Sequence, residues 1–338
     1  MKNRLKQNKR INKMLALSLA MVLALAFALV VHAEGEEREK CKPGDLCGFN
    51  TLNAGAECFN IPTQVYSVNG EFFIADAYNH QILFTDNYYN HPSNWQVVGA
   101  KLFRPHAIAS DGTIYMVVDT DNNRVVTYAK NEIGFQVVEC FEDVGVRPHY
   151  VEYDATTKQF YVWSSMTGTM YIYKRNSNDL TVTLKKTAYI ADLDGCYTRS
   201  FTIDGNKIYF PSAGRSAIYV VNKSNFRVRA IYPVAAELGG MVQVRHEQNY
   251  YYLVTSTDAS GDQSKATIVR STSLGGFVEG SYEDIRAMFP EMDGVPYYIS
   301  HLEDGHYYTP VLLGSSGGYI CRFDIVDDEI TNVINIKY

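Results

Sequence analysis

Two histidines of this chain stand at the same place in two similar stretches of sequence. Each ends an Arg-Pro-His triplet, at residues 104–106 and 147–149. Imidazole groups serve as metal ligands and as general acids or bases near neutral pH. Two imidazoles alone make a poor Zn²⁺ site, because such sites normally have three or four protein ligands. His106 and His149 are therefore catalytic and metal-ligating candidates that need further partners.

Other familiar catalytic patterns are missing from the sequence. It contains no GxSxG, HExxH or P-loop motif. The polar run from Asp119 to Arg124 is typical of a turn whose short side chains bond nearby backbone. A Ca²⁺ loop is the alternative interpretation, but the run lacks the regular acidic alternation and the terminal Glu of such loops.

The two triplets open two copies of a unit that recurs six times along the chain. Each unit begins with a short strand, passes through a turn rich in Gly, Asn or Asp, and continues with apolar strands separated by small polar turns. The 278 residues from 61 to 338 give about 46 residues per unit, the length of a four-stranded propeller blade. The units begin near Ile61, Arg104, Arg147, Cys196, Gly240 and Pro296.

This repetition predicts an all-β fold, a six-bladed β-propeller of four-stranded antiparallel blades over residues 61–338. One four-stranded meander leaves two edges open, whereas a ring of blades buries both faces of every sheet. In the second unit, Ile114, Met116 and Val118 are expected on one face of a strand. A row of separate β-sandwiches is the alternative, but it needs longer units.

Composition and charge restrict the possible partners. The chain is 46% hydrophobic, 13% aromatic and 20% charged, which is typical of a globular protein, and its 26 tyrosines favour strands. Residues 1–33 hold six basic and no acidic residues, so the rest has 25 of the 31 basic residues against all 37 acidic ones. Such an acidic surface repels phosphate backbones and anionic lipids, which argues against nucleic acid as a partner.

The first 33 residues are expected to be a secretory signal peptide. A basic stretch leads into the apolar run from Met14 to Val31, and Val-His-Ala at residues 31–33 places small residues where a signal peptidase cleaves. An uncleaved membrane anchor is the alternative, because about 18 apolar residues just span a bilayer. Either way, residues 34–60 form a tail outside the cytoplasm, and the protein is expected to be secreted or extracytoplasmic.

Six cysteines remain after this segment, at positions 41, 47, 58, 140, 196 and 321. An even number in an exported chain favours disulfides, although six cysteines allow fifteen pairings. Cys41 with Cys47 could close a small loop, and Cys58 could tie the tail to the body. Unpaired buried thiols are the alternative.

Blades 1 and 2 resemble NHL repeats. Blade 2 follows Arg-Pro with DGTIYMVVDTDNNRVVTY, and blade 1 has Asn-His-Gln-Ile at residues 79–82. Blade 3 keeps Arg-Pro but loses the Asp/Asn turn, and blades 4–6 keep the strand pattern with few motif residues. The resemblance implies a six-bladed propeller with a central channel. It implies no single function, because NHL-like propellers include protein-binding scaffolds, an amidating lyase, a streptogramin lyase and lactonase-like hydrolases.

The resemblance also implies where the candidate residues lie. The first strand of each blade is innermost, and its first residues stand at one rim of the channel. His106 and His149 then lie on neighbouring blades, as do the channel histidines that follow a Pro-His pattern in propeller lyases. Tyr197 or Arg199 takes the corresponding place in blade 4, Tyr297 takes it in blade 6, and His301 lies near the first turn of blade 6. We expect His106, His149, Arg199, Tyr297 and His301 to bind a ligand.

Two functions from different classes follow. The first is a secreted, monomeric scaffold that binds a protein, peptide or glycan at a blade rim. The second is a metal-assisted lyase or hydrolase, with His106, His149 and His301 as candidate ligands of Zn²⁺ or Ca²⁺ in the channel. The histidine set is incomplete in blades 4 and 5, so the scaffold is favoured. Duplication of a blade, without any shared ligand, also accounts for the paired triplets.

Overall fold

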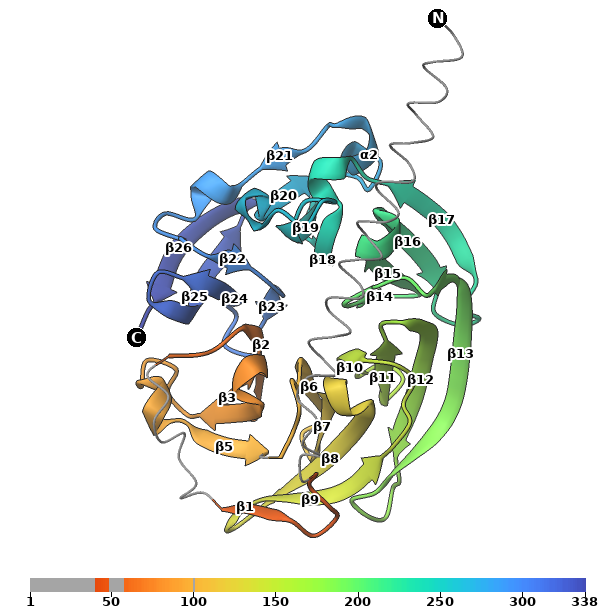
Figure 1. Ribbon diagram of the computed structural model, residues 1–338, viewed down its shortest axis with the longest axis vertical. Coiled ribbons are helices and arrows are strands. Elements are labelled where there is room, and N and C mark those ends of the chain that lie inside the picture. Colours follow the sequence, from red (N-terminus) through yellow and green to blue (C-terminus); the bar gives the residue numbers. More distant parts are fainter. Residues whose placement is uncertain (1–39, 49–57, 100) are drawn as a thin grey trace, which may run out of the picture. The chain divides into compact units, whose positions relative to one another are not determined.

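The fold is a six-bladed β-propeller, and each blade is a four-stranded antiparallel sheet (Figure 1). It is seen in a computed structural model that describes residues 40–48, 58–99 and 101–338. The expected fold class and blade count are therefore confirmed. The expected signal peptide, residues 1–33, lies outside the described residues. Within the described ranges, every helix is too short or too polar to cross a membrane.

Each blade follows the chain from the central channel outward. Blade 1 contains β2 (Pro62–Val68), β3 (Glu71–Asp76), β4 (Gln81–Thr85) and β5 (Gln96–Gly99). Blade 2 contains β6 (Ala107–Ser110), β7 (Ile114–Asp119), β8 (Arg124–Asn131) and β9 (Gly134–Phe141). Blade 3 contains β10 (Pro148–Asp154), β11 (Gln159–Ser164), β12 (Thr167–Arg175) and β13 (Val182–Asp194).

The later blades are less regular. Blade 4 contains β14 (Thr202–Asp204), β15 (Lys207–Ser212), β16 (Ala217–Asn222) and β17 (Val228–Pro233). Blade 5 contains β18 (Gly240–Glu247), β19 (Tyr250–Thr257), β20 (Thr267–Ser271) and β21 (Glu283–Asp284). Blade 6 contains β22 (Val295–Pro296), β23 (Ser300–His301), β24 (Tyr307–Gly314), β25 (Gly317–Val326) and β26 (Glu329–Ile336).

Helical turns in the described chain are short. One α-helical turn, α2 (Gly276–Glu279), lies within blade 5, between β20 and β21. The 3₁₀ turns are η1 (Ala77–Asn79), η2 (Pro92–Asn94), η3 (Thr120–Asn122), η4 (Ala213–Arg215), η5 (Ala236–Leu238), η6 (Gln263–Lys265) and η7 (Arg286–Met288).

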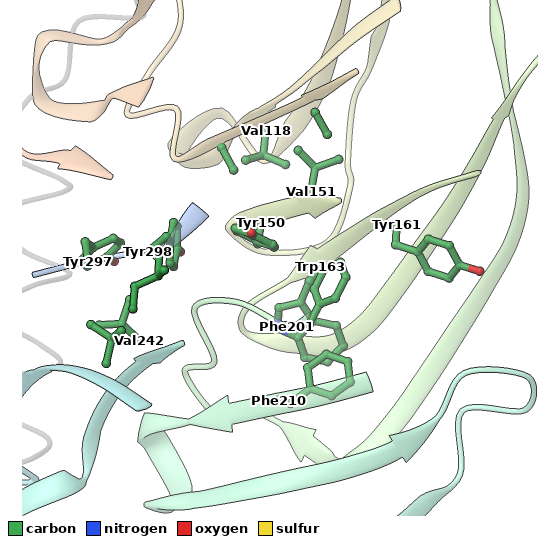
Figure 2. Close-up of a cluster of buried hydrophobic side chains, with 14 of the residues drawn as sticks. Val118, Tyr150, Val151, Tyr161, Trp163, Phe201, Phe210, Val242, Tyr297 and Tyr298 are labelled. Atoms are coloured by element: carbon green, nitrogen blue, oxygen red, sulfur yellow. The ribbon is translucent and has the colours of Figure 1, made fainter. Parts of the chain in front are cut away.

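The core lies between the blades. Every residue of β7 is buried, and its two faces enter different clusters. Ile114, Met116 and Val118 join the cluster that runs through blades 2 to 6, while Tyr115 and Val117 join the one shared with blade 1. The expected division of this strand is confirmed, and it explains why a propeller strand is a continuous apolar run. Between blades 3 and 4, the Trp163 and Phe210 rings lie 4.5 Å apart (Figure 2).

The ring closes between blades 6 and 1 without exchange of a strand. Each of these blades is formed by one continuous segment. Phe59, just before blade 1, makes a β-bridge with Gly318 of β25. Its ring packs edge-on against Tyr338, with centroids 5.2 Å apart, and the Tyr338 hydroxyl donates to the Tyr88 carbonyl at 2.7 Å. Side chains and one bridge therefore hold the seam.

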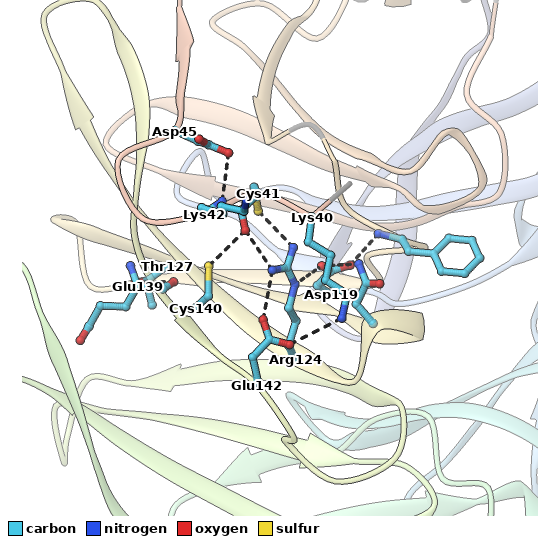
Figure 3. A network of polar contacts seen from close by, with 12 residues as sticks. Lys40, Cys41, Lys42, Asp45, Asp119, Arg124, Thr127, Glu139, Cys140 and Glu142 are labelled. Carbon is cyan, nitrogen blue, oxygen red and sulfur yellow. Dashed lines mark hydrogen bonds and ion pairs between the residues drawn. The ribbon is translucent and has the colours of Figure 1, made fainter. Parts of the chain in front are cut away.

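The segment 40–48 adds a fifth strand to blade 2. Its strand β1 (Leu46–Gly48) pairs antiparallel with the outer strand β9. Arg124, which is 1% exposed, anchors the segment from inside the blade (Figure 3). Its guanidinium donates to Asp119 Oδ2 at 2.7 Å and to the Cys41 carbonyl at 3.0 Å. The strand covers an edge that would otherwise be open to other chains.

The expected disulfides are not found, because all six cysteines carry free thiols. The Cys41 sulfur does not face Cys47; it accepts from the Arg124 guanidinium at 3.2 Å. The neighbouring Cys140 thiol donates to the Cys41 carbonyl at 3.6 Å. Hydrogen bonds and β1 hold this segment in place of the covalent loop that the spacing suggested.

Candidate functional site

A repeated turn places the first residues of the candidate site. In blade 2, Asp119 accepts from the Phe103 amide at 2.6 Å and from Asn122 Nδ2 at 2.8 Å, which closes the turn η3. The turn ends at Asn123 in the left-handed region, with φ 53°, and Asn123 Oδ1 accepts from the Arg147 amide at 2.8 Å. The turn of one blade thus fixes the arginine that enters the next blade.

Blade 1 has the same kind of turn, with a histidine at the position that Asn123 takes in blade 2. Asp76 accepts from Asn79 Nδ2 at 2.8 Å and closes η1, and His80 takes the left-handed position with φ 61°. His80 Nδ1 accepts from the Arg104 amide at 3.2 Å. Arg104 has φ 51° and Arg147 has φ 56°, which are uncommon values for residues other than glycine. These conformations change the direction of the backbone at both arginines, just before the chain enters an innermost strand.

Asp121 joins the two arginine side chains. Its carboxylate oxygens lie 3.1 Å from Arg104 Nη1 and 3.1 Å from Arg147 Nη2, and its side chain is 6% exposed. The carboxylates of Asp76 and Asp119 accept from the asparagines of their own turns instead. In both arginines the Nε–H is buried and has no hydrogen-bond partner among the described residues.

His106 and His149 lie in contact, as the repeated triplets suggested. Their rings stack with centroids 3.9 Å apart and an interplanar angle of 18°. His149 is fully buried. Its Nδ1 lies 3.0 Å from the Tyr298 hydroxyl, and its Nε2 lies 3.2 Å from the Tyr197 hydroxyl.

These contacts define the state of His149. Tyr298 gives its only hydroxyl proton to the Arg199 carbonyl at 3.1 Å, so it accepts a proton from His149 Nδ1. Nε2 therefore accepts from Tyr197, and the ring is neutral. Burial, followed by the charges of His106, Arg147 and Arg199, lowers the His149 pKa well below its usual value. Both nitrogens are engaged, which makes His149 a positioning residue rather than a ready metal ligand.

His106 is the less satisfied member of the pair. Its side chain is buried, at 6% exposure, and its Nδ1 has no hydrogen-bond partner in the described part of the chain. Burial lowers its pKa well below 6.5, and Arg147, Arg199 and Arg104 lower it further. The neutral ring therefore offers a nitrogen to a ligand within a cationic environment.

Arg199 completes this environment from blade 4. Its Nη1 donates to the Met241 carbonyl at 2.9 Å, and its guanidinium lies 4.9 Å from the centre of the Tyr197 ring. Tyr297 of blade 6 is buried within reach of the Arg199 charge, and burial raises the pKa of its hydroxyl above the usual value. We call Arg104, His106, Arg147, His149 and Arg199 the cationic rim.

Aromatic and amide side chains divide the channel beyond the cationic rim. Tyr298 lies between Tyr297 and Tyr150, with ring centroids 4.6 Å and 4.9 Å apart (Figure 2). The innermost strand of blade 6 is interrupted here between β22 and β23, opposite Pro310, which has no N–H to donate. Gln243 compensates by bonding both the amide and the carbonyl of Ile299, at 2.7 and 3.2 Å. This layer gives the channel two separate mouths.

The structure does not bring His301 to the cationic rim. It is exposed, stacks on Tyr307 with centroids 4.3 Å apart, and lines a cavity at the other mouth. Within the described ranges, no three His, Cys, Asp or Glu residues are grouped so that they could hold a metal ion. The proposed trio His106, His149 and His301 is therefore not a metal site in this arrangement.

Sequence reasoning found the two histidines, Arg199 and Tyr297, and missed Asp121 and Tyr298. The repeated Arg-Pro pairs are a usable signal for Arg104 and Arg147. Asp121 lies at the centre of a turn sequence, and only the position of the next blade shows that it meets two arginines. Nothing in the sequence near Tyr298 indicates its bond to His149.

The sequence matches no known protein family and no curated protein. Solved structures resemble it in fold. A candidate 6-phosphogluconolactonase from Bacteroides uniformis has a TM-score of 0.57 at 7% identity, over 85% of this chain and 88% of that one. A second, from Bacteroides fragilis, has a TM-score of 0.56 at 10% identity, over 86% and 92%. A streptogramin B lyase has a TM-score of 0.53 at 13% identity, over 85% and 86%. At such identities the likeness concerns the fold alone.

Proposed function

We propose that this protein is an exported binding protein, and that its cationic rim receives an anionic group of a peptide or glycan. The observation that carries the proposal is the cluster of buried, unpartnered nitrogens at this rim. Arg104 Nε, Arg147 Nε and His106 Nδ1 all lack a partner among the described residues. Buried polar groups are normally hydrogen-bonded, so each of these atoms would gain a partner from a ligand that the rim side chains shift to admit.

The charges at the rim favour an anion. Arg104, Arg147 and Arg199 bring three positive charges, and Asp121 is the carboxylate that pairs with the first two. Arg199 donates to backbone carbonyls instead of a carboxylate. Because both histidines are neutral, roughly two positive charges remain unbalanced. A guanidinium with a free Nε–H can bind a carboxylate or phosphate in the two-point manner.

The export of the protein, its monomeric state and its likeness to NHL-type scaffolds are parts of the same proposal. The basic and apolar segment 1–33 supports a secretory route. The divided channel supports binding at one mouth rather than passage through the ring, because Tyr150 and Tyr298 fill its middle. The acidic remainder of the surface would keep anions away from other sites.

Calorimetric titration of the purified protein tests this function. The probes are a glutamate tripeptide and an oligogalacturonate, with a glutamine tripeptide and cellotriose as their neutral counterparts. We expect one acidic probe to bind, added salt to weaken it, and Arg147→Gln to weaken it about tenfold. Arg229→Gln, on the exposed outer strand β17, is the matched control. Equal binding of the neutral counterpart, or unchanged binding by Arg147→Gln, would contradict the proposal.

A lyase or hydrolase reaction is the second candidate. The neutral His106 ring, with its unpartnered Nδ1, is suited to take a proton from a bound acid-bearing substrate. His149 would hold that ring by stacking, and the arginines would stabilise an anion formed beside it. Mass spectrometry of the bound probe after incubation distinguishes the candidates. Cleavage that His106→Gln abolishes, with binding retained, favours the enzyme.

A further inference from the structure

The other mouth of the channel has a cavity that the cationic rim does not use. It has a volume of about 180 Å³ and is lined by residues from all six blades. These residues come from the later part of the innermost strands, such as Tyr66 of β2, Glu152 of β10 and Arg245 of β18. The cavity is thus lined mainly by strand residues, with Glu303 from the turn after β23, whereas most rim residues precede the innermost strands.

The fixed charges around this cavity leave an excess of acid. Arg245 is paired with Glu247 of its own strand. Lys223 is paired with Asp154 at 2.7 Å. Glu152 and Glu303 line the cavity and make no ion pair within the described part of the chain, although the Arg245 and Lys223 charges act on Glu152 from a distance. The Glu152 carboxylate accepts a long bond of 3.4 Å from the Ile203 amide, and Glu303 accepts from the Gly70 amide at 3.1 Å.

At the Glu152 carboxyl group, the effect of burial outweighs the attraction of the nearby cations. Burial raises its pKa to about 8, against a lowering contribution from Arg245. The groups that act on it are Arg245 from β18, Asp154 on its own strand, the Lys223 ammonium and the Ile203 amide of β14. Tyrosine rings complete the lining, with Tyr66 and Tyr150 from blades 1 and 3. Aromatic faces attract cations, which adds to the preference set by the two carboxyl groups.

We propose that this mouth is a second binding site, specific for a small protonated amine that pairs with Glu152. The volume corresponds to roughly six water molecules, so the site holds an aminoalkyl group or a single amino sugar. The amine ionises Glu152 as it binds and lies against the tyrosine rings. The proton that Glu152 carried in the empty site is released to solvent. This site is independent of the anion site, because the layer of Tyr150 and Tyr298 separates them.

Ligand-observed NMR titration of the purified protein at pH 8 tests the proposal with butylamine, and 1-butanol is the neutral control. We expect butylamine to bind and 1-butanol not to. Glu152→Gln weakens butylamine binding at least tenfold, and Glu303→Gln weakens it a few-fold. Glu329→Gln, exposed at the start of the outer strand β26, is the matched control and leaves binding unchanged. Thermal unfolding of each variant confirms that it is folded.

The pH dependence of butylamine affinity distinguishes recognition of the protonated amine from nonspecific apolar binding. Because Glu152 must lose a proton, affinity is expected to rise about tenfold per pH unit from 6 towards 8, and Glu152→Gln abolishes this rise. Acetyl-lysinamide and glucosamine then distinguish a peptide source of the amine from a sugar source. Equal binding of 1-butanol, full binding by Glu152→Gln, or no binding of any of the three amines would overturn the proposal.

Discussion

The two mouths of the channel differ in charge although the same six strands reach both. At the cationic rim, residues that precede the innermost strands, together with His149 at the start of β10, bring together three arginines and two neutral histidines. At the other mouth, which we call the acidic mouth, Glu152 of β10 and Glu303, in the turn after β23, line one cavity. Backbone conformations with positive φ place Arg104 and Arg147 at the rim, whereas the pleat of β10 places Glu152 at the acidic mouth. A repeated fold can thus carry different charges at the two ends of its axis while its blades keep their symmetric arrangement.

The comparison also extends to acid and base behaviour. The folded protein holds His106 and His149 with lowered pKa values at the rim, and Glu152 with a raised pKa at the acidic mouth. All three groups are therefore neutral near pH 7. Protonation of the two histidines in the unfolded chain lowers stability as pH falls below about 6.5, while ionisation of Glu152 in the unfolded chain lowers stability as pH rises above about 4.5.

The largest effect is expected from removing the layer that separates the mouths. Tyr298→Ala deletes a fully buried ring and the bond to His149, so the free energy of unfolding should fall by about 3–5 kcal/mol. Urea unfolding measures the change. Tyr189→Ala, on the outer strand β13 with 59% exposure, is the control and should cost no more than about 0.5 kcal/mol. Similar losses in both variants would show that Tyr298 is not part of a closed layer.

The next effect concerns the carboxylate shared by the arginines. Asp121→Asn leaves Arg104 and Arg147 close together without their common partner, and we expect a loss of roughly 2–3 kcal/mol. Added phosphate should restore part of the loss if the rim binds anions. Asp179→Asn, at an exposed turn, is the control. A variant that phosphate does not stabilise beyond the control would weaken the anion assignment.

A gain in stability is expected at the acidic mouth. The pKa of Glu152 is about 8 in the folded protein, so the wild type loses stability as pH rises from the unfolded value near 4.5 towards 8. Glu152→Gln removes this loss and should be about 1–3 kcal/mol more stable than the wild type at pH 8, with little difference at pH 4. Urea unfolding across this range measures it. A constant difference at all pH values would mean that Glu152 is not neutral in the folded state.

The smallest effect concerns His106 at the rim, where stability changes with pH in the direction opposite to that at Glu152. Because the His106 pKa is lowered, the wild type loses stability as pH falls below about 6.5, where the unfolded chain takes up the proton. His106→Gln should remove about 1 kcal/mol of the loss between pH 6.5 and 5. The same substitution at His301, exposed at the acidic mouth, is the control. An unchanged slope in His106→Gln would contradict the lowered pKa.

The sequence allowed prediction of the features that repeat along the chain, but not of the contacts that join one blade to another. The periodic strands predicted the six blades, and the Arg-Pro-His triplets predicted that His106 and His149 would be neighbours. Asp121 and Tyr298 escaped notice because their partners lie on other blades. The Cys41 pairing failed for a similar reason, because its sulfur meets Arg124 and not the cysteine that is close in sequence. Local patterns give elements, while contacts between elements decide which polar groups remain free.

The seam between the first and last blades has a further consequence for protein engineering. No strand crosses it, and the Phe59 ring lies 5.2 Å from that of Tyr338. A short linker could therefore join residue 338 to residue 58, and new ends could be cut in a loop between two other blades. Such a circular permutant would keep the four strands of every blade, would give up only the added strand β1 of blade 2, and would present the same two mouths from a differently ordered chain.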